Sequence, residues 1–303
     1  MNIMDQLARR ISELKNPTVA GLDTRIEYLP EKFVQAILPE GIRSFEDAAE
    51  AVYQYNVRLV DALCDIVPAV KVQVAYYEMY GVAGMAAFEK TMAYAKSKGM
   101  IVMADVKRND IGATAACYAN AYVGKTPMPY GEEKAFSADI ATINPYLGVD
   151  GIKPFTEACA ANGTGVFALV KTSNPSSGQL QDMRYEDGRT LYEAVADLVE
   201  EWGESTRGDS GYSAVGAVVG ATYPQQAPRC ARACRIPSSS CRATARRARP
   251  ARTSPAALTK AATAQSSTRP APSSAPGRSA RACRLTWRPA TRRCACARIC
   301  AAA

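Results

Sequence analysis

The sequence predicts an α/β fold in which parallel strands alternate with helices around a barrel. Short apolar runs and segments of helical period follow one another through most of the chain. Strands and helices that alternate in this way form parallel sheets that helices cover on the outside. Charged and polar residues come directly after several of the apolar runs, and α/β barrels keep their chemistry at this end of their strands.

The strands are expected at six apolar runs, each of the length of a buried strand. They are PTVAGLD (17–23), AVKVQ (69–73), MIVMADV (100–106), ADIATINP (138–145), GVFALVKT (165–172) and VGAVVGAT (215–222). Six strand–helix units in about 220 residues indicate a (β/α)8 TIM barrel, of which strands one to six can be read. Strands seven and eight are not visible in the sequence that follows.

Helical periodicity fills the segments between these strands. Residues 44–66, 85–99 and 190–204 carry apolar residues at helical spacing, and residues 111–124 follow the third strand as a further helix. The N-terminal residues 1–16 predict an amphipathic helix of mixed charge, without the apolar centre of a secretory signal. No apolar stretch has the length to span a membrane.

The charge of the chain changes sharply near residue 226. Of the 303 residues, 1–226 hold 20 Lys and Arg against 29 Asp and Glu, whereas 227–303 hold 17 Lys and Arg and no acidic residue. The net charges of −9 and +17 together give the overall +8. Residues 227–303 also show no strand-like run and no amphipathic period, so they cannot bury a core. We therefore predict an incomplete barrel over residues 1–226 and a basic, low-complexity, disordered tail.

Cysteine usage in the first part of the chain indicates a reduced compartment. Cys64, Cys117 and Cys159 lie in core-like surroundings, and the other seven cysteines belong to the tail. Disulfides are rare in cytosolic proteins, which suits isolated cysteines of this kind. We expect a cytoplasmic protein.

The segment DVKRND, residues 105–110, carries the strongest indication of chemistry. It ends the third apolar run, and side chains on a strand alternate, so Asp105 and Lys107 are expected on the same face. Opposite charges at the end of a buried strand are costly unless they hold each other or a ligand. Asp110 follows at the start of the next helix.

Polar residues follow the other strands as well. They are Asp23 in VAGLDTR, Lys71 in AVKVQ, Asn144 in TINPYLG, Lys171 to Pro175 in VKTSNPSSG, and the segment GATYP after the sixth strand. Together with ADVKRNDIGAT, these segments resemble the orotidine 5′-phosphate decarboxylase family, above all its longer bacterial subfamily. The resemblance covers residues 1–226.

The resemblance implies decarboxylation of orotidine 5′-phosphate to UMP, the last step of de novo pyrimidine synthesis, with no cofactor and no metal. Its catalytic array corresponds to Lys71, Asp105, Lys107 and Asp110, and the family implies a homodimer in which Asp110 reaches the neighbouring subunit's site. The substrate-binding positions that it implies are Asp23 for a ribose hydroxyl, Ile111 and Thr114 for base and ribose, and Ser173 for the pyrimidine edge.

The tail departs from the family. Its last two loops typically carry PGYGAQG and a later SSR, and neither string is present. Codons for PGYGAQG read one nucleotide later can give RATARRA (242–248). Shifted codons for MPHSFFL and VISSRAI can likewise give CRIPSSS (234–240) and SSAPGRS (273–279). Three such decodings, in one frame and in the family's order, indicate that the tail is a frameshifted reading of strands seven and eight.

Other interpretations stay open. A magnesium-dependent sugar-phosphate decarboxylase or aldolase of the same barrel superfamily also carries an Asp-x-Lys strand end. An inactive, truncated barrel is a further alternative, and its basic tail would attract nucleic-acid phosphates without specificity. The tail arginines lack interleaved aromatic residues, so no specific nucleic-acid partner is expected. The pairs Cys230/Cys234 and Cys294/Cys296 lack the matched second pair of a zinc site.

Overall fold

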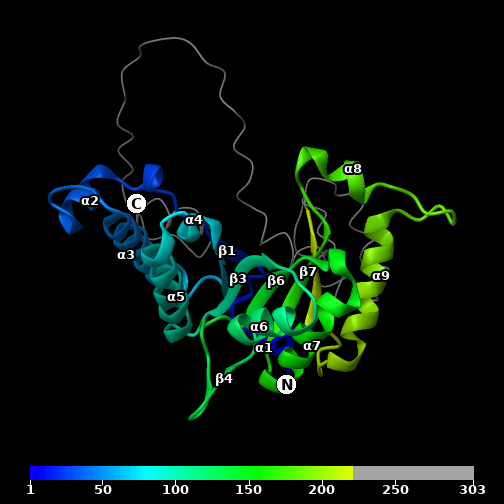
Figure 1. Cartoon of the computed structure of the whole chain (residues 1–303). Coiled ribbons are helices and arrows are strands. Elements are labelled where there is room, and N and C mark those ends of the chain that lie inside the picture. Colours follow the sequence, from blue (N-terminus) through cyan, green and yellow to red (C-terminus); the bar gives the residue numbers. More distant parts are fainter. Residues whose placement is uncertain (221–303) are drawn as a thin grey trace, which may run out of the picture.

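A curled sheet of six parallel strands forms the centre of the molecule, in a computed structural model that describes residues 1–220 (Figure 1). The strand order follows the chain, and each strand pairs in parallel with the next. The strands are β1 (Val19–Leu22), β2 (Ala69–Gln73), β3 (Ile101–Arg108), β6 (Ile140–Ile143), β7 (Gly165–Lys171) and β8 (Val215–Val219). All six predicted strands are confirmed, although the last two residues of the sixth prediction lie outside the described residues. The predictions for strands seven and eight and for the tail also lie outside them.

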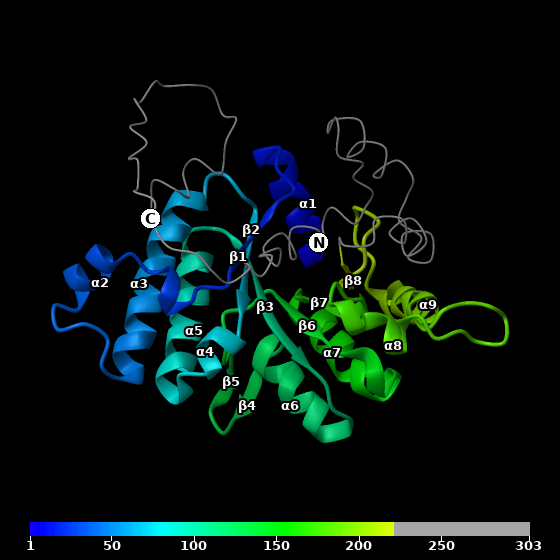
Figure 2. The same cartoon turned by 90° about the horizontal axis from the view of Figure 1, so that it is seen from above.

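Helices cover the outer face of the sheet (Figure 2). Two of them begin at capping boxes that the sequence carries, Ser44 with Asp47 and Thr190 with Glu193, in which the acidic side chain accepts from the backbone N–H of the residue that precedes the helix, at 3.0 Å and 2.9 Å. These outer helices are α3 (Phe45–Leu63), α5 (Gly81–Ser97), α6 (Gly112–Tyr122), α7 (Val149–Asn162) and α9 (Leu191–Gly203).

Shorter elements complete the connections. They are the helices α2 (Glu31–Ile37), α4 (Ala75–Glu78) and α8 (Gly178–Gln181), the antiparallel hairpin β4 (Thr126–Met128) and β5 (Gly131–Glu133), and the 3₁₀ turns η1 (Ile26–Tyr28), η2 (Pro145–Leu147), η3 (Pro175–Ser177) and η4 (Glu204–Thr206). Within residues 1–220, no helix is both long and apolar enough to cross a membrane.

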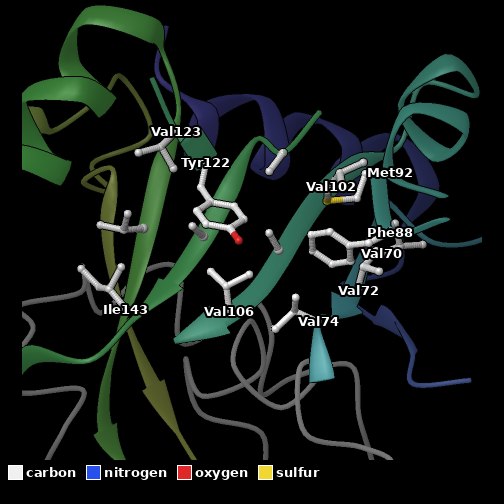
Figure 3. Packing of buried hydrophobic residues seen from close by; sticks show 14 of the residues in the cluster. Val70, Val72, Val74, Phe88, Met92, Val102, Val106, Tyr122, Val123 and Ile143 are labelled. Carbon is white, nitrogen blue, oxygen red and sulfur yellow. The ribbon is translucent and has the colours of Figure 1, made fainter. Parts of the chain in front are cut away.

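The main core lies between the sheet and the outer helices (Figure 3). Val70 and Val72 of β2 and Val102 of β3 point outward, and they pack with Phe88 and Met92 of α5. Each of these side chains is completely buried. Strand alternation then places the intervening residues of the same strands on the inner face of the sheet.

The inner face is apolar near the N-terminal ends of the strands. Val19, Ala69, Met103, Ile140 and Phe167 form a second buried cluster there. The first helix, α1 (Ile3–Leu14), closes this cluster with Ile3, Met4 and Leu7. Figure 2 shows α1 on the opposite side of the sheet from α6 and α7.

Hydrogen bonds tie the start of α1 to the segment that precedes β8. The amide of Asn2 donates to the carbonyls of Thr206 (2.9 Å) and Tyr212 (3.0 Å). The carboxylate of Asp5 accepts from the backbone N–H groups of Ser210 (2.8 Å) and Asp209 (3.3 Å). Because β1 and β8 are the outer strands of the described sheet, α1 links its two edges across the base.

Candidate active site

Above the apolar base, the same inner face of the sheet becomes polar. Lys71 and Gln73 follow Ala69 at strand spacing in β2, Asp105 follows Met103 in β3, and Thr142 follows Ile140 in β6. These side chains therefore continue the inward-facing rows toward the C-terminal ends of parallel strands. Three neighbouring strands thus bring them to one place.

Asp105 is the centre of this polar cluster. Its Oδ2 accepts hydrogen bonds from Lys71 Nζ (2.9 Å) and Gln73 Nε2 (3.0 Å). Its Oδ1 accepts from Lys107 Nζ (2.5 Å) and Thr142 Oγ1 (2.8 Å). Four donors, two of them cations, hold the carboxylate in one orientation, and charge-assisted bonds of this type are stronger than neutral ones.

Lys71 bridges two carboxylates. Its Nζ lies 2.9 Å from Asp105 and 3.2 Å from Asp23 at the end of β1, and its side chain is 4% exposed. Burial opposes the charged form of Lys71, but the two carboxylates outweigh it and raise the pKa of Lys71 above its ordinary value. Burial likewise opposes the charged form of Asp105, yet Lys71 and Lys107 lower the pKa of that carboxyl. Both groups are therefore held in their ionised forms.

Lys107 sits in an irregular part of its strand. Ala104 pairs with Ala141 and Arg108 pairs with Ile143, so residues 105–107 of β3 face one residue of β6. Lys107 has a φ of 47°, a left-handed conformation that non-glycine residues rarely adopt. The predicted contact between Asp105 and Lys107 is present, but the prediction of regular strand alternation is wrong at this point because the bulge interrupts it. Strained conformations of this kind gather at functional sites.

Comparison with known proteins gives the family. The family model described as orotidine 5′-phosphate decarboxylase / HUMPS matches residues 43–259. The chain belongs to this family. The match runs past residue 226, where the composition changes, and into residues that the structure does not describe.

Relatives in the orotidine 5′-phosphate decarboxylase family align with most of the chain. The orotidine 5′-phosphate decarboxylase of Caldicellulosiruptor saccharolyticus is 42% identical over 229 residues, which cover 76% of this chain and 75% of that protein. The protein of the same name from Rhodopirellula baltica is 41% identical over 227 residues, covering 75% and 72% of the two chains.

Solved structures agree with the fold. The OMP decarboxylase of Leishmania donovani has a TM-score of 0.59 and 29% identity, covering 78% of this chain and 77% of that chain. A protein from Streptomyces avermitilis described as a putative orotidine 5′-phosphate decarboxylase has a TM-score of 0.58 and 30% identity, covering 72% and 69%. The TIM-barrel fold is therefore shown, and residues 1–220 supply six of its strands as a curled half-barrel.

The structure brings together four of the residues that the sequence singles out, Asp23, Lys71, Asp105 and Lys107. Within residues 1–220 it does not join Asp110 to them, and the carboxylate of Asp110 accepts from the N–H of Ile111 at 2.8 Å. Ile111 is 54% exposed, and Thr114 is exposed on the first turn of α6.

Ser173 lies in the loop that follows β7 and is half-buried there. A side chain at Gly220 would meet the backbone of Ser173, so the end of β8 packs closely against this loop. Side chains also hold the loop together, because Gln181 Oε1 accepts from Thr172 N (2.9 Å) and Gln181 Nε2 donates to Thr172 Oγ1 (2.8 Å).

Sequence reasoning missed two residues of the cluster, Gln73 and Thr142. Gln73 stands two residues after Lys71 in the same strand, so the alternation that placed Lys71 inward could also have placed Gln73 inward. Thr142 is the one polar side chain in the buried strand Ile140–Ile143, and a buried hydroxyl needs a partner. Within residues 1–220, no three His, Cys, Asp or Glu side chains gather as a metal-ligand set.

Proposed function

We propose that this protein decarboxylates orotidine 5′-phosphate to UMP, the last step of de novo pyrimidine biosynthesis, in the cytoplasm. Membership in the family and the names of relatives that are 41–42% identical support this activity. The observation that carries it is the Lys71–Asp105–Lys107 cluster at the C-terminal ends of parallel strands.

Lys107 is the acid in this proposal. Loss of carbon dioxide breaks the bond to C6 of the pyrimidine and leaves the electron pair on that carbon. An ammonium group close to C6 stabilises the developing charge and then transfers a proton to the carbon. The side chain of Lys107 is 45% exposed, against 4% for Lys71, so its ammonium remains accessible to a substrate and to solvent for reprotonation.

Asp105 and Lys71 set the electrostatics around this acid. Asp105 would face the substrate carboxylate, and this unfavourable pairing of like charges ends when carbon dioxide leaves. The buried ammonium of Lys71 stabilises Asp105 as an anion in the absence of substrate. The two lysines therefore have separate roles, one as counter-charge and one as proton donor.

The remaining residues bind substrate and complete the site in a homodimer. Asp23 is assigned to a ribose hydroxyl, Ile111 and Thr114 to base and ribose, and Ser173 to the pyrimidine edge. Asp110 is assigned to the array of the neighbouring subunit. The exposure of Ile111 and Thr114 supports this arrangement, because both lie where a substrate or a second subunit can cover them.

The alternative is a magnesium-dependent reaction on a sugar phosphate. The family description and the Asp-x-Lys strand end are compatible with it. One assay separates the two: orotidine 5′-phosphate is supplied with and without a chelator, and UMP is measured by chromatography. We expect equal UMP formation in both samples. Activity that the chelator abolishes, or that appears only with a sugar phosphate, would contradict the proposal.

A further inference from the structure

Thr142 lies where the regular pairing of β3 and β6 breaks down. It stands alone on β6 opposite residues 105–107 of β3. A bulge of this kind leaves backbone N–H groups without their usual strand partner. The hydroxyl of Thr142 replaces that partner, because Val106 N and Lys107 N each donate to its Oγ1 at 3.0 Å.

The same hydroxyl also contacts the central carboxylate, since Thr142 Oγ1 donates to Asp105 Oδ1 at 2.8 Å. A hydroxyl has one proton to donate and two lone pairs that accept. Because two backbone N–H groups use the lone pairs, the proton is directed to Asp105. Thr142 is 3% exposed, so water does not compete for these bonds. Its hydrogen-bonding capacity is fully used.

These three bonds connect the bulge to the proposed acid. The N–H of Lys107 is bonded to Thr142 while Lys107 holds its left-handed φ of 47°. A residue stays in such a conformation only when its surroundings fix it. The ammonium of the same residue meets the carboxylate that Thr142 also contacts. One hydroxyl therefore acts on both partners of the Asp105–Lys107 pair.

We propose that Thr142 is a positioning residue, whose hydroxyl fixes the carboxylate of Asp105 and the backbone of Lys107 for the transfer of the proton. The inference rests on the proposed decarboxylation. It also has a consequence that does not depend on turnover. The hydroxyl is one of the donors that favour ionised Asp105, so its removal raises the pKa of that carboxyl.

The charged groups around Asp105 define what that measurement reports. They are Lys71 on β2, Lys107 on β3 and, through Lys71, Asp23 at the end of β1. Gln73 contributes a neutral donor. A substitution of Thr142 changes none of these charges, so a shift in the pKa of Asp105 reports the lost hydroxyl and the geometry that depends on it.

The test compares Thr142→Val, which removes the hydroxyl at nearly constant shape, with Thr142→Ser, which keeps it. Both are made in the full chain, and kcat and KM for orotidine 5′-phosphate are measured against pH. The pKa of Asp105 is followed by carboxyl NMR. We expect Thr142→Val to lower kcat by about tenfold or more, because small displacements of catalytic groups are costly. KM should stay within about threefold, since substrate-binding groups are untouched, and the pKa of Asp105 should rise.

Thr142→Ser should restore both readouts to near the wild-type values. Thr164→Val is the matched control, because Thr164 is also buried and donates to the carbonyl of Val123 at 2.6 Å, just before β7 begins and away from the cluster. It should leave the kcat and the pKa of Asp105 unchanged. If Thr142→Val does not fold, Thr142→Ala provides the same comparison.

Two results would overturn the inference: a Thr142→Val protein with unchanged kcat and unchanged Asp105 pKa, or a Thr142→Ser protein as impaired as Thr142→Val. An error in the proposed function can be distinguished from these two results, because the wild-type chain itself would then form no UMP. In that case the pKa of Asp105 in the three proteins alone decides whether the hydroxyl positions the carboxylate.

Discussion

Lys71 and Lys107 contact the same carboxylate from opposite surroundings. Lys71 comes from the middle of a buried strand and has carboxylates on two sides, whereas Lys107 lies within the bulge of β3 and keeps its side chain half-exposed. A cation enclosed by anions contributes to stability and charge balance. A cation that faces open space can meet a substrate. Replacing Lys107 should therefore mainly lower activity, whereas replacing Lys71 should mainly lower stability.

Replacement of Lys107 by alanine should remove nearly all decarboxylation and leave the fold intact. Loss of one electrostatic donor of this kind costs roughly 3–4 kcal/mol of transition-state stabilisation, and loss of the proton source adds to it. UMP formation measures the activity, and circular dichroism checks the fold. Retention of more than about a tenth of the activity, against an expected loss of at least 10²-fold, would rule out Lys107 as the acid.

Replacement of Lys71 by alanine should destabilise the protein itself. The change leaves Asp105, whose side chain is 9% exposed, without its buried counter-charge. Removing one partner of a buried pair costs about 3–5 kcal/mol. Denaturant unfolding measures this loss. Lys153→Ala is the control, because Lys153 pairs with Glu157 at 3.8 Å on the surface of α7, and an exposed pair contributes about 0.3–0.5 kcal/mol. Equal losses in the two variants would contradict the assignment of Lys71.

The sequence predicted which residues form the cluster, but it did not predict the local backbone conformation. Asp23, Lys71, Asp105 and Lys107 could be predicted because charges at the ends of apolar strands need partners. The bulge could not, because left-handed residues are usually signalled by glycine or asparagine, and here the residue is Lys107. The partners of Asp110, Ile111, Thr114 and Ser173 stay a prediction, since the described chain does not bring them to the cluster.

At the scale of elements, α1 closes the base of the sheet. It buries Ile3, Met4 and Leu7 against the inner face of the strands, and its first turn holds the segment before β8. The inner face is thereby divided into an apolar base and a polar end. The helix supports the polar cluster from below without contributing a residue to it.

The hydrogen bonds between α1 and the segment before β8 predict that replacing Asp5 lowers the free energy of unfolding. Asp5→Ala removes the capping box of α1 and the bonds to Ser210 and Asp209. The partly buried N–H groups of Asn2, Asp209 and Ser210 would lose a charged acceptor, at a cost on the order of 1–3 kcal/mol. Arg9→Ala is the control on the same helix, because Arg9 is 71% exposed and pairs only with its neighbour Glu13 among the contacts described. The two variants are compared by their free energies of unfolding. An equal decrease in both would show that the hydrogen bonds of Asp5 do not stabilise the protein.

Elements with strong periodicity were predictable, and irregular ones were not. The six strands and the helices α1, α3, α5, α6 and α9 appear where apolar patterns placed them, within a few residues. The helix α7 was missed because it contains Gly151 and Pro154, which break the helical pattern in the sequence. The hairpin β4–β5 was missed because its residues are mostly exposed and carry no alternating apolar face.

At the scale of the whole molecule, the described sheet has two outer strands, β1 and β8, that do not pair with each other. A closed barrel of this family needs two further strands between them. The interpretation of residues 227–303 as a frameshifted sequence places those strands in the other reading frame. This interpretation falls on residues outside the structure, and it stays a prediction.

Restoring one nucleotide tests it. The chain with the restored frame should be more soluble and should form UMP faster than the chain as it stands, because a closed barrel protects the outer strand edges and remote contacts to the substrate phosphate add transition-state binding. Both proteins are expressed side by side, and soluble yield and turnover are compared. Equal yield and equal turnover would show that residues 227–303 are a genuine part of the enzyme.

Assembly can be tested by mixing two inactive variants. If Asp110 completes the site of a second subunit, Asp110→Ala and Lys107→Ala proteins should together recover activity, because a mixed dimer has one site with neither change. Activity is measured after subunit exchange, and native mass spectrometry verifies that exchange has occurred. Mixed dimers without any recovered activity would place Asp110 within the site of its own chain.

The bonds between α1 and the segment before β8 also affect the order in which the chain can fold during synthesis. Asn2 and Ser210 belong to opposite ends of the described chain, and Asp5 lies 205 positions before Ser210. At about 5–20 residues per second, the ribosome needs roughly 10–40 s to make that interval. The helix α1 is thus made before the strands that it covers, yet it is among the last of the described elements to complete its contacts. Until the final described strand has been made, α1 lacks the hydrogen-bond partners that precede β8, so we expect its packing on the base of the sheet to be completed late.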